Sequence, residues 1–201
     1  MKRTQALRPH APACPAPRPP AATAAATVEI RPARPDDAER GRDFLTRLSP
    51  DTRALRFFTG VGRPTPALVR ALVTRDDRRD VLLAVRRTPH GDEVVGHAMS
   101  CHVVPPGGAG EGDGAARPVA EIGIVVADDW QGRGIGERLL RRLLLRAAAR
   151  GATEAVMDVL AENHRLLRAI RRRWPDAIMR MSYGTVEVRT GLKARGTSFA
   201  E

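Results

Sequence analysis

The chain has 201 residues, which is enough for one domain with its own hydrophobic core. Hydrophobic residues make up 42% of it and charged residues 28%, as is ordinary for a soluble globular protein, and no apolar run reaches the length of a transmembrane helix. The net charge is +11, and all but two of the 34 basic residues are arginine. A basic surface suits anionic partners such as phosphate groups and argues against a polycationic substrate.

The two cysteines, Cys14 and Cys101, lie in a basic tail and in an expected strand, so they do not indicate a disulfide framework. This usage fits a reducing compartment, and we expect a cytoplasmic protein without a membrane anchor. Residues 1–27 are largely proline, alanine and arginine and contain no acidic residue. We expect a disordered tail there, since the segment lacks the apolar run of a secretory signal; an organellar transit peptide is the alternative.

The first half of the domain is expected to hold one strand followed by helices. Residues 28–31 alternate as a strand does, and a helix is expected over 36–48 with Asp36 or Asp37 as its cap. Ser49 and Pro50 are typical of a helix start, so a second helix follows and runs to Phe58. A third short helix is expected over 65–75.

The middle of the chain favours antiparallel strands. Residues 81–87 and 93–104 are expected to form a hairpin, and the apolar run 121–126 is expected to be a buried third strand. The sequence positions of His97 and His102 differ by an odd number. The two side chains therefore face opposite sides of their strand and cannot bind one metal ion. We expect no metal site. Residues 105–117 are expected to form a flexible loop.

A strand over 153–160 would complete a parallel strand–helix–strand unit that begins at Ala120. A helix over 163–173 and a closing hairpin, with strands at 177–181 and 185–190, complete the expected order of elements. The chain is therefore predicted to be α/β, with a mixed, mostly antiparallel central sheet of about seven strands flanked by helices. We expect one domain over 28–192, followed by a flexible tail at 193–201.

The glycine-rich segment from Gln131 to Gly136 joins the third strand of this middle region to a leucine-rich helix. Glycines let a backbone pass close to a ligand, and the first N–H groups of the helix are free to bind an anion. Arg133 would add a charged contact. The segment therefore predicts a phosphate or diphosphate site made mainly of main-chain groups.

Three known phosphate loops were compared with this segment. A P-loop ends in Gly-Lys followed by Ser or Thr, which the segment lacks. A Rossmann fingerprint needs Gly-x-Gly-x-x-Gly directly after the strand; Asp158 would suit its ribose-binding acid, but the expected antiparallel strands do not fit that fold. The pattern Gln/Arg-x-x-Gly-x-Gly/Ala fits at Gln131, Gly134 and Gly136. It resembles the signature motif of the GCN5-related N-acetyltransferases (GNAT), and the predicted order of elements matches their acyl-CoA N-acyltransferase fold.

The resemblance implies acetyl-CoA as co-substrate. In the family, the strand before the loop separates from its neighbour, and its peptide groups pair with the pantetheine arm and stabilise the oxyanion. The residues implied to contact acetyl-CoA are Ile124, Val125, Val126, Gln131, Gly132, Arg133, Gly134, Ile135, Gly136 and Asn163.

The segment around Glu121 resembles the Ala-Glu-x-x-Ile/Val-Val-Val pattern of bacterial protein-lysine acetyltransferases, in which this glutamate is the general base. The resemblance also covers the paired helices before residue 58. We expect Glu121 to be a partly buried carboxylate, although a strand-edge glutamate paired with an arginine is the structural alternative. One position departs from the family: Ile170 stands where many members carry a tyrosine as the general acid.

The sequence thus predicts an acetyl-CoA-dependent N-acetyltransferase whose acceptor is a primary amine, a small molecule or a protein lysine. A non-catalytic acyl-CoA sensor of the same fold is the first alternative. Nucleic-acid binding through the basic tail and the arginine-rich helices is the second, and the low aromatic content of 3% argues against a base-stacking surface. The acceptor and the oligomeric state are not readable from the sequence.

Overall fold

The computed structural model describes residues 27–58, 64–103 and 118–192. The tail expected over 193–201, the loop expected over 105–117 and all but the last residue of the tail expected over 1–27 lie outside the described residues. Among the described residues, no helix is long and apolar enough to cross a membrane.

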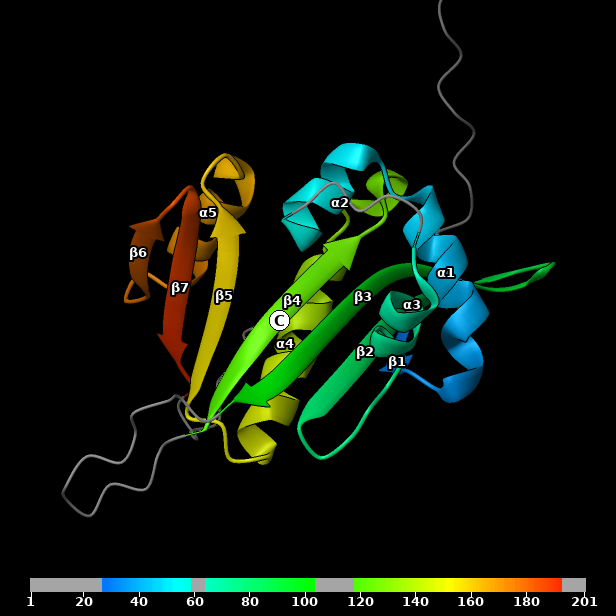
Figure 1. Ribbon diagram of the computed structural model, residues 1–201, viewed down its shortest axis with the longest axis horizontal. Coiled ribbons are helices and arrows are strands. Elements are labelled where there is room, and N and C mark those ends of the chain that lie inside the picture. The colour runs from blue at the N-terminus through cyan, green and yellow to red at the C-terminus, as the bar shows by residue number, and fades with distance from the viewer. Residues whose placement is uncertain (1–26, 59–63, 104–117, 193–201) are drawn as a thin grey trace, which may run out of the picture.

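A single sheet forms the centre of the molecule (Figure 1). Its strands are β1 (Val28–Pro32), β2 (Arg79–Thr88), β3 (Gly91–Val103), β4 (Val119–Val126), β5 (Glu154–Leu160), β6 (Ile178–Ser182) and β7 (Thr185–Gly191). They lie in the order β1-β2-β3-β4-β5-β7-β6, and every neighbouring pair is antiparallel except β4 and β5. The predicted mixed, mostly antiparallel sheet is confirmed.

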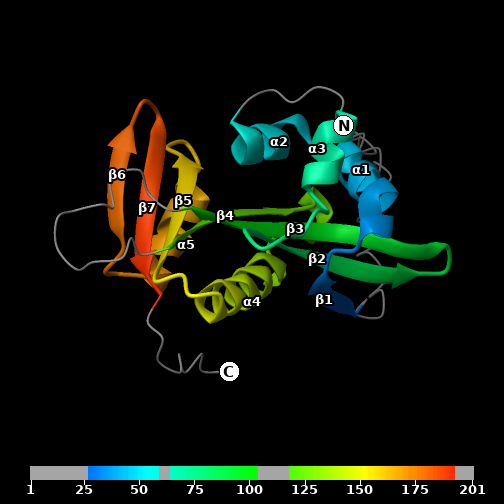
Figure 2. The same cartoon turned by 60° about the horizontal axis from the view of Figure 1, so that its bottom comes forward.

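Helices cover both faces of this sheet (Figure 2). In chain order, the helices before β2 are η1 (Pro35–Asp37), α1 (Ala38–Arg47), α2 (Pro50–Phe57) and α3 (Pro66–Ala71). Those after β4 are η2 (Asp128–Trp130), α4 (Ile135–Ala149) and α5 (His164–Arg173). Helix α4 packs on one face, and α1 and α3 pack on the other. The two faces therefore have separate hydrophobic clusters.

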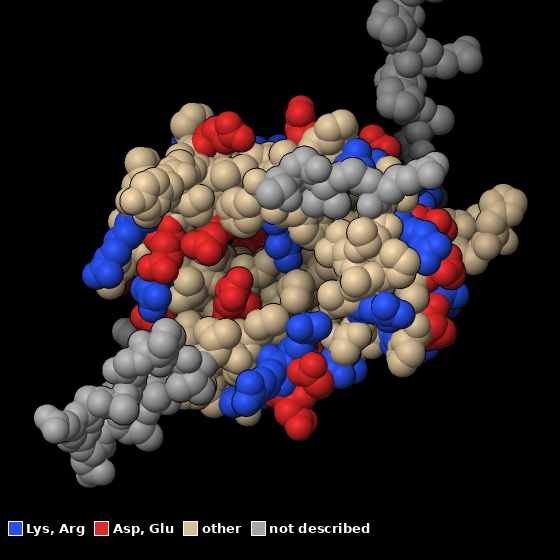
Figure 3. Space-filling model, viewed as in Figure 1, with Lys and Arg blue, Asp and Glu red and all other residues tan. Residues whose placement is uncertain are grey.

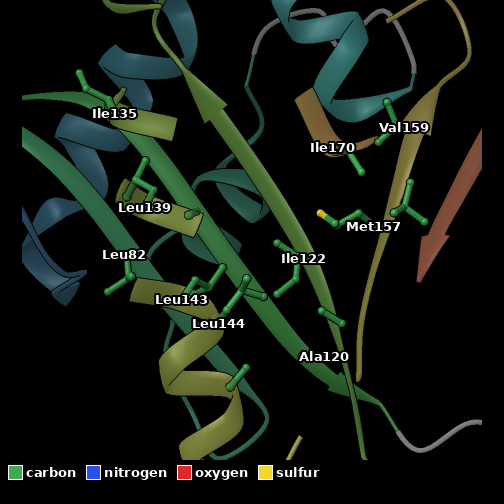
Figure 4. Packing of buried hydrophobic residues seen from close by; sticks show 14 of the residues in the cluster. Leu82, Ala120, Ile122, Ile135, Leu139, Leu143, Leu144, Met157, Val159 and Ile170 are labelled. Carbon is green, nitrogen blue, oxygen red and sulfur yellow. The ribbon is translucent and has the colours of Figure 1, made fainter. Parts of the chain in front are cut away.

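The larger cluster lies between α4 and the sheet (Figure 4). Leu139 and Leu143 of α4 are fully buried, as the leucine spacing predicts. A Cβ placed on Gly96 of β3 would lie 3.1 Å from Leu139 Cδ1 and 3.3 Å from Ile135 Cγ2. The absence of a side chain at Gly96 thus lets α4 pack closely on β3, and this fixes where the helix begins.

One local expectation was wrong and one holds in part. The helix expected over 65–75 ends at Ala71, and Asp76 then accepts hydrogen bonds from the N–H groups of Arg78 and Arg79 where the chain turns into β2. Asp37 is the N-cap residue of α1, as predicted, but its side chain makes no capping hydrogen bond to that helix. Its buried carboxylate instead accepts two hydrogen bonds from Arg31, each 2.7 Å long, and so ties β1 to the helix start.

Candidate active site

Strand β4 is paired differently along its two edges. All eight of its residues pair with β3, from Val119 opposite Val103 to Val126 opposite Gly96. Towards β5, pairing covers three positions and ends with Glu121 opposite Val156. The two strands then separate (Figure 1). From Ile122 onward, β4 therefore has an open edge in the middle of the sheet, as the family resemblance implies.

The direction of the peptide groups on this edge follows from one hydrogen bond. The N–H of Ala127 donates to the carbonyl of Val95 over 2.9 Å, so residue 127 faces β3. Because peptide groups alternate along a strand, those of Val125 face β3 as well, while those of Ile124 and Val126 face the opening. Ile124 and Val126 thus lie as the sequence prediction requires, whereas Val125 uses its own peptide groups in the sheet.

The glycine loop directly follows η2 and leads into α4. Gly132 and Gly134 have φ of 75° and 74°, in the left-handed region that favours glycine. Within the described part of the chain, the N–H groups of residues 132–137 donate to no partner. They lie at the N-terminal, positive end of a 15-residue helix. This arrangement is an anion site built from the main chain.

Two arginines flank this loop. The guanidinium of Arg133 stacks on the ring of Trp130, with 4.7 Å between its carbon and the ring centre. Arg165, in the first turn of α5, brings a terminal nitrogen to 3.4 Å from the position that a Cβ on Gly132 would occupy. Arg165 was not among the predicted site residues. Its place two residues after Asn163 was the only available signal.

The side chain of Gln131 points towards α2 and the end of β4. Its amide donates to the carbonyl of Val126 over 3.2 Å and to Thr52 Oγ1 over 3.3 Å. The side chain of Gln131 is thus already hydrogen-bonded, and that of Arg133 is stacked on Trp130. Ile135 is buried under the loop and Gly136 lies in the first turn of α4.

Asp128 links the same helix α2 to the segment before the loop. Its carboxylate accepts hydrogen bonds from Ser49 N, Ser49 Oγ and Thr52 Oγ1, over 3.0, 2.7 and 2.7 Å. Burial alone would raise the pKa of Asp128, but these hydrogen bonds outweigh it and lower the pKa below its ordinary value. An ionised Asp128 therefore fixes α2 beside the open edge of β4.

Glu121 lies on the face of the sheet opposite α4, and its side chain is exposed. The expected partial burial was wrong: the separation of β4 from β5 begins directly after this residue and leaves its carboxylate open to solvent. Among the described residues Glu121 makes no hydrogen bond or ion pair, so the strand-edge ion pair is not formed. Asp158 and Glu187 lie on the same face of β5 and β7. Figure 3 shows a hollow on this face that contains both acidic and basic side chains.

The two histidines of β3 lie on opposite faces, as their spacing predicts. His97 is fully buried, and its Nε2 lies 2.9 Å from the carbonyl of Leu72. Burial, together with the charge of Arg56, lowers the pKa of His97 to about 3, so its ring is neutral. It packs under the face that carries Glu121 and has no access to solvent.

Helix α5 contains Ile170 and begins after Asn163, its N-cap residue. Asn163 caps this helix, and its Oδ1 accepts from Leu166 N over 3.2 Å. Ile170 is buried in the large cluster, and with Met157 it points into the space between β4 and β5 (Figure 4). Tyr183, the one tyrosine of the chain, is fully exposed in the turn between β6 and β7.

The fold and the open edge of β4 define the class of protein. The sequence profile of the acetyltransferase (GNAT) family matches residues 44–173, which is most of the described chain. The chain belongs to this family.

Individual relatives agree with this assignment. An acetyltransferase of Pseudomonas aeruginosa is 33% identical over 121 residues, and the match spans 58% of each chain. Among solved structures, the GNAT domain of S. lividans PAT is similar with a TM-score of 0.67 and 25% identity, over 82% of this chain and 90% of that one. Arabidopsis thaliana NAA60 in complex with acetyl-CoA shares the fold at 17% identity, with a TM-score of 0.59 over 82% of this chain and 98% of that one. A cAMP-binding acyltransferase from Mycobacterium smegmatis matches over 87% of this chain and 46% of its own length, with 26% identity and a TM-score of 0.53.

Proposed function

We propose that this protein transfers an acetyl group from acetyl-CoA to a primary amine, with a protein lysine as the leading acceptor. The observation that carries the proposal is the row of N–H groups at residues 132–137, which have no partner among the described residues and lie next to the open edge of β4. Such a row suits the diphosphate of coenzyme A, and Arg133 and Arg165 would add charge to it. The carbonyl of Ile124 and the N–H of Val126 would pair with the pantetheine amides, and Asn163 would contact the same arm.

The acceptor would approach on the face opposite α4. The carboxylates of Glu121 and Asp158 lie there, and this favours an ammonium group over an anion as the approaching end of the substrate; the carboxylate of Glu187 on the same face is paired with Arg189. Glu121 is the proposed general base because it lies where the open edge begins. It would accept a proton from the ammonium group directly or through water.

The amine nitrogen then attacks the thioester carbon. A C–N bond forms and the C–S bond breaks. Of the two protons that the nitrogen loses, the first passes through Glu121 to solvent and the second goes to the thiolate. The N–H of Ile124 faces the opening and is the proposed donor to the oxyanion. Ile170 cannot act as an acid, but a thiol with a pKa near ~8.5 is a tolerable leaving group without one.

The absence of a tyrosine at Ile170 also gives the sensor hypothesis its support, since a module that only binds acyl-CoA needs no acid. One experiment separates the two functions. The purified chain is mixed with acetyl-CoA and a panel of amines that includes lysine peptides, and thiol release is followed together with coenzyme A binding by calorimetry. We expect release with at least one amine, and a decrease of about 10²- to 10⁴-fold in kcat for Glu121→Gln with unchanged coenzyme A binding.

The matched control is Glu29→Gln, since Glu29 is an exposed glutamate on the edge strand β1. It should leave both kcat and binding unchanged. Binding of acetyl-CoA without thiol release for any amine, and with no effect of Glu121→Gln, would favour the sensor. Failure to bind coenzyme A at all would refute both functions.

A further inference from the structure

The side chain of Arg56 extends from α2 to β4 and covers Gly123. A Cβ placed on Gly123 would lie 2.5 Å from Arg56 Cζ and 3.1 Å from Nη1, so the guanidinium occupies the space that any other residue at 123 would fill. Gly123 is the next residue after Glu121 on this face of the strand. Arg56 therefore lies beside the proposed base and over the start of the open edge.

This guanidinium has no hydrogen-bond partner among the residues that the structure describes. Its Nε is buried without an acceptor among those residues, and its Cζ lies 5.2 Å from the centre of the Phe57 ring. By contrast, carboxylate oxygens of Asp37 or Asp80 accept from four arginines: Arg31, Arg40, Arg75 and Arg146. A half-buried arginine with unused donors is costly unless a ligand supplies the acceptor.

The surroundings of Arg56 retain its charge. Burial lowers the pKa of Arg56 from its ordinary value, and the nearby carboxylate of Glu121 acts in the opposite direction. The guanidinium remains ionised at neutral pH because its pKa is so high in water. His97, which also lies near, is neutral. Arg56 is thus a fixed positive charge facing the place where acyl transfer is proposed to occur.

We propose that Arg56 forms a carboxylate-binding subsite at the acyl-transfer centre. This inference rests on the proposed function, since it names a substrate group for the same site. The planar guanidinium matches a carboxylate in shape and donor spacing. The carboxylate belongs either to the acceptor, as in a free amino acid whose ammonium group lies beside Glu121, or to the far end of a dicarboxylic acyl chain on coenzyme A.

Two matched ligand pairs separate these sources. Succinyl-CoA and butyryl-CoA have acyl chains of the same length, and a carboxylate replaces the terminal methyl in the first. Free lysine and lysinamide differ in the carboxylate of the acceptor and are titrated with coenzyme A present. Dissociation constants are measured by calorimetry for the full chain, so the result does not depend on turnover.

The variants are Arg56→Met, which removes the charge, Arg56→Lys, which keeps it, and Gly123→Ala, which leaves Arg56 in the chain but displaces its guanidinium. We expect Arg56→Met and Gly123→Ala to weaken binding of the carboxylate-bearing member of one pair at least tenfold, and its partner less than about twofold, as for the loss of one charged hydrogen-bonded pair. Arg56→Lys should retain part of the preference. The control Arg42→Met removes an exposed arginine of α1 and should change none of the four constants.

Equal loss for both members of each pair, or no preference for a carboxylate in the parent chain, would overturn the inference. Thermal unfolding of each variant shows whether the fold is retained, and Gly123→Ala tests the subsite even if Arg56→Met does not fold. If no amine is acetylated but the carboxylate preference depends on Arg56, the proposed function fails and the subsite stands. If an amine is acetylated but the carboxylate preference does not depend on Arg56, the proposed function stands and the subsite fails.

Discussion

The two edges of β4 are formed by the same eight residues but are hydrogen-bonded to very different extents. Towards β3, eight consecutive positions are paired and the strand is an ordinary part of the sheet. Towards β5, three positions are paired and the rest of the edge is open, although it lies in the middle of the sheet. The closed edge gives stability, and the open edge presents peptide groups that a ligand can bind. A change at one position should therefore affect folding or binding according to the edge that it faces.

Proline substitutions at neighbouring positions test this comparison most strongly. Val125→Pro removes an N–H that faces β3, whereas Ile124→Pro removes one that faces the opening, where proline is better tolerated. We expect Val125→Pro to lower the free energy of unfolding by at least about 3 kcal/mol. Ile124→Pro should cost less stability but abolish measurable coenzyme A binding. Denaturant unfolding and calorimetry measure the two effects, and equal destabilisation by both prolines would contradict the assignment of edges.

His97, opposite Val125 on the closed side, predicts a pH effect. Its pKa is about 3 in the folded chain and 6.5 ordinarily, so between these values only the unfolded chain binds the proton. Stability should therefore fall as the pH drops below about 6.5, by up to about 1.4 kcal/mol per pH unit. His97→Gln keeps a hydrogen-bond donor for the carbonyl of Leu72. It should remove the contribution of His97 to the change of unfolding free energy with pH. Denaturant unfolding of both proteins from about pH 7 to about pH 4.5 measures it, and parallel curves would refute it.

Gly134→Ala tests the loop on the open side. No atom lies within 4 Å of the new Cβ, so the cost is the left-handed backbone alone, about 1–2 kcal/mol of stability. Realignment of the N–H groups should also weaken coenzyme A binding, by about tenfold. Gly136→Ala is the matched control, since its Cβ would lie 3.7 Å from Val126 Cγ2 in ordinary contact. We expect it to raise stability by about 0.5–1 kcal/mol because alanine favours a helix. Similar losses for both alanines would argue against a conformational role of Gly134.

Asp128→Asn should give the smallest change, about 1 kcal/mol, because the amide keeps some of the hydrogen bonds to Ser49 and Thr52. Since the pKa of Asp128 is lowered in the folded chain, its contribution is present above the ordinary value of 3.8 and is lost as the pH falls through the folded value. Wild type and variant should therefore differ at neutral pH and converge in acid. Denaturant unfolding of both proteins at neutral pH and in acid tests this. A difference in the free energy of unfolding that persists in acid would contradict it.

The strands and the loop were predictable because local patterns determine them. Alternation and apolar runs mark strands that bury one or both faces, and glycines at 132 and 134 mark the positive φ values. The start of α2 at Ser49 and Pro50 also followed from residue type, and Ser49 Oγ accepts from Thr52 N over 3.1 Å.

The contacts that shape the site were not predictable, because they join distant segments. Asp128 and Ser49 are 79 residues apart, and nothing in either segment indicates the other. The placement of Arg56 on Gly123 requires that a glycine and a long side chain meet across two elements. The burial of Glu121 was wrongly expected from its apolar strand, because exposure there depends on where β5 departs and not on the residues of β4.

Trp130 gives the molecule a built-in optical reporter. Its indole lies between the guanidinium groups of Arg86 and Arg133, at 5.2 and 4.7 Å, directly before the glycine loop. An anion that draws Arg133 away from the ring alters the electric field at the indole and hence its fluorescence. The chain has one other tryptophan, Trp174, at the end of α5, so a Trp174→Phe background isolates the signal. Arrival of a ligand at the loop can then be timed in milliseconds without a label.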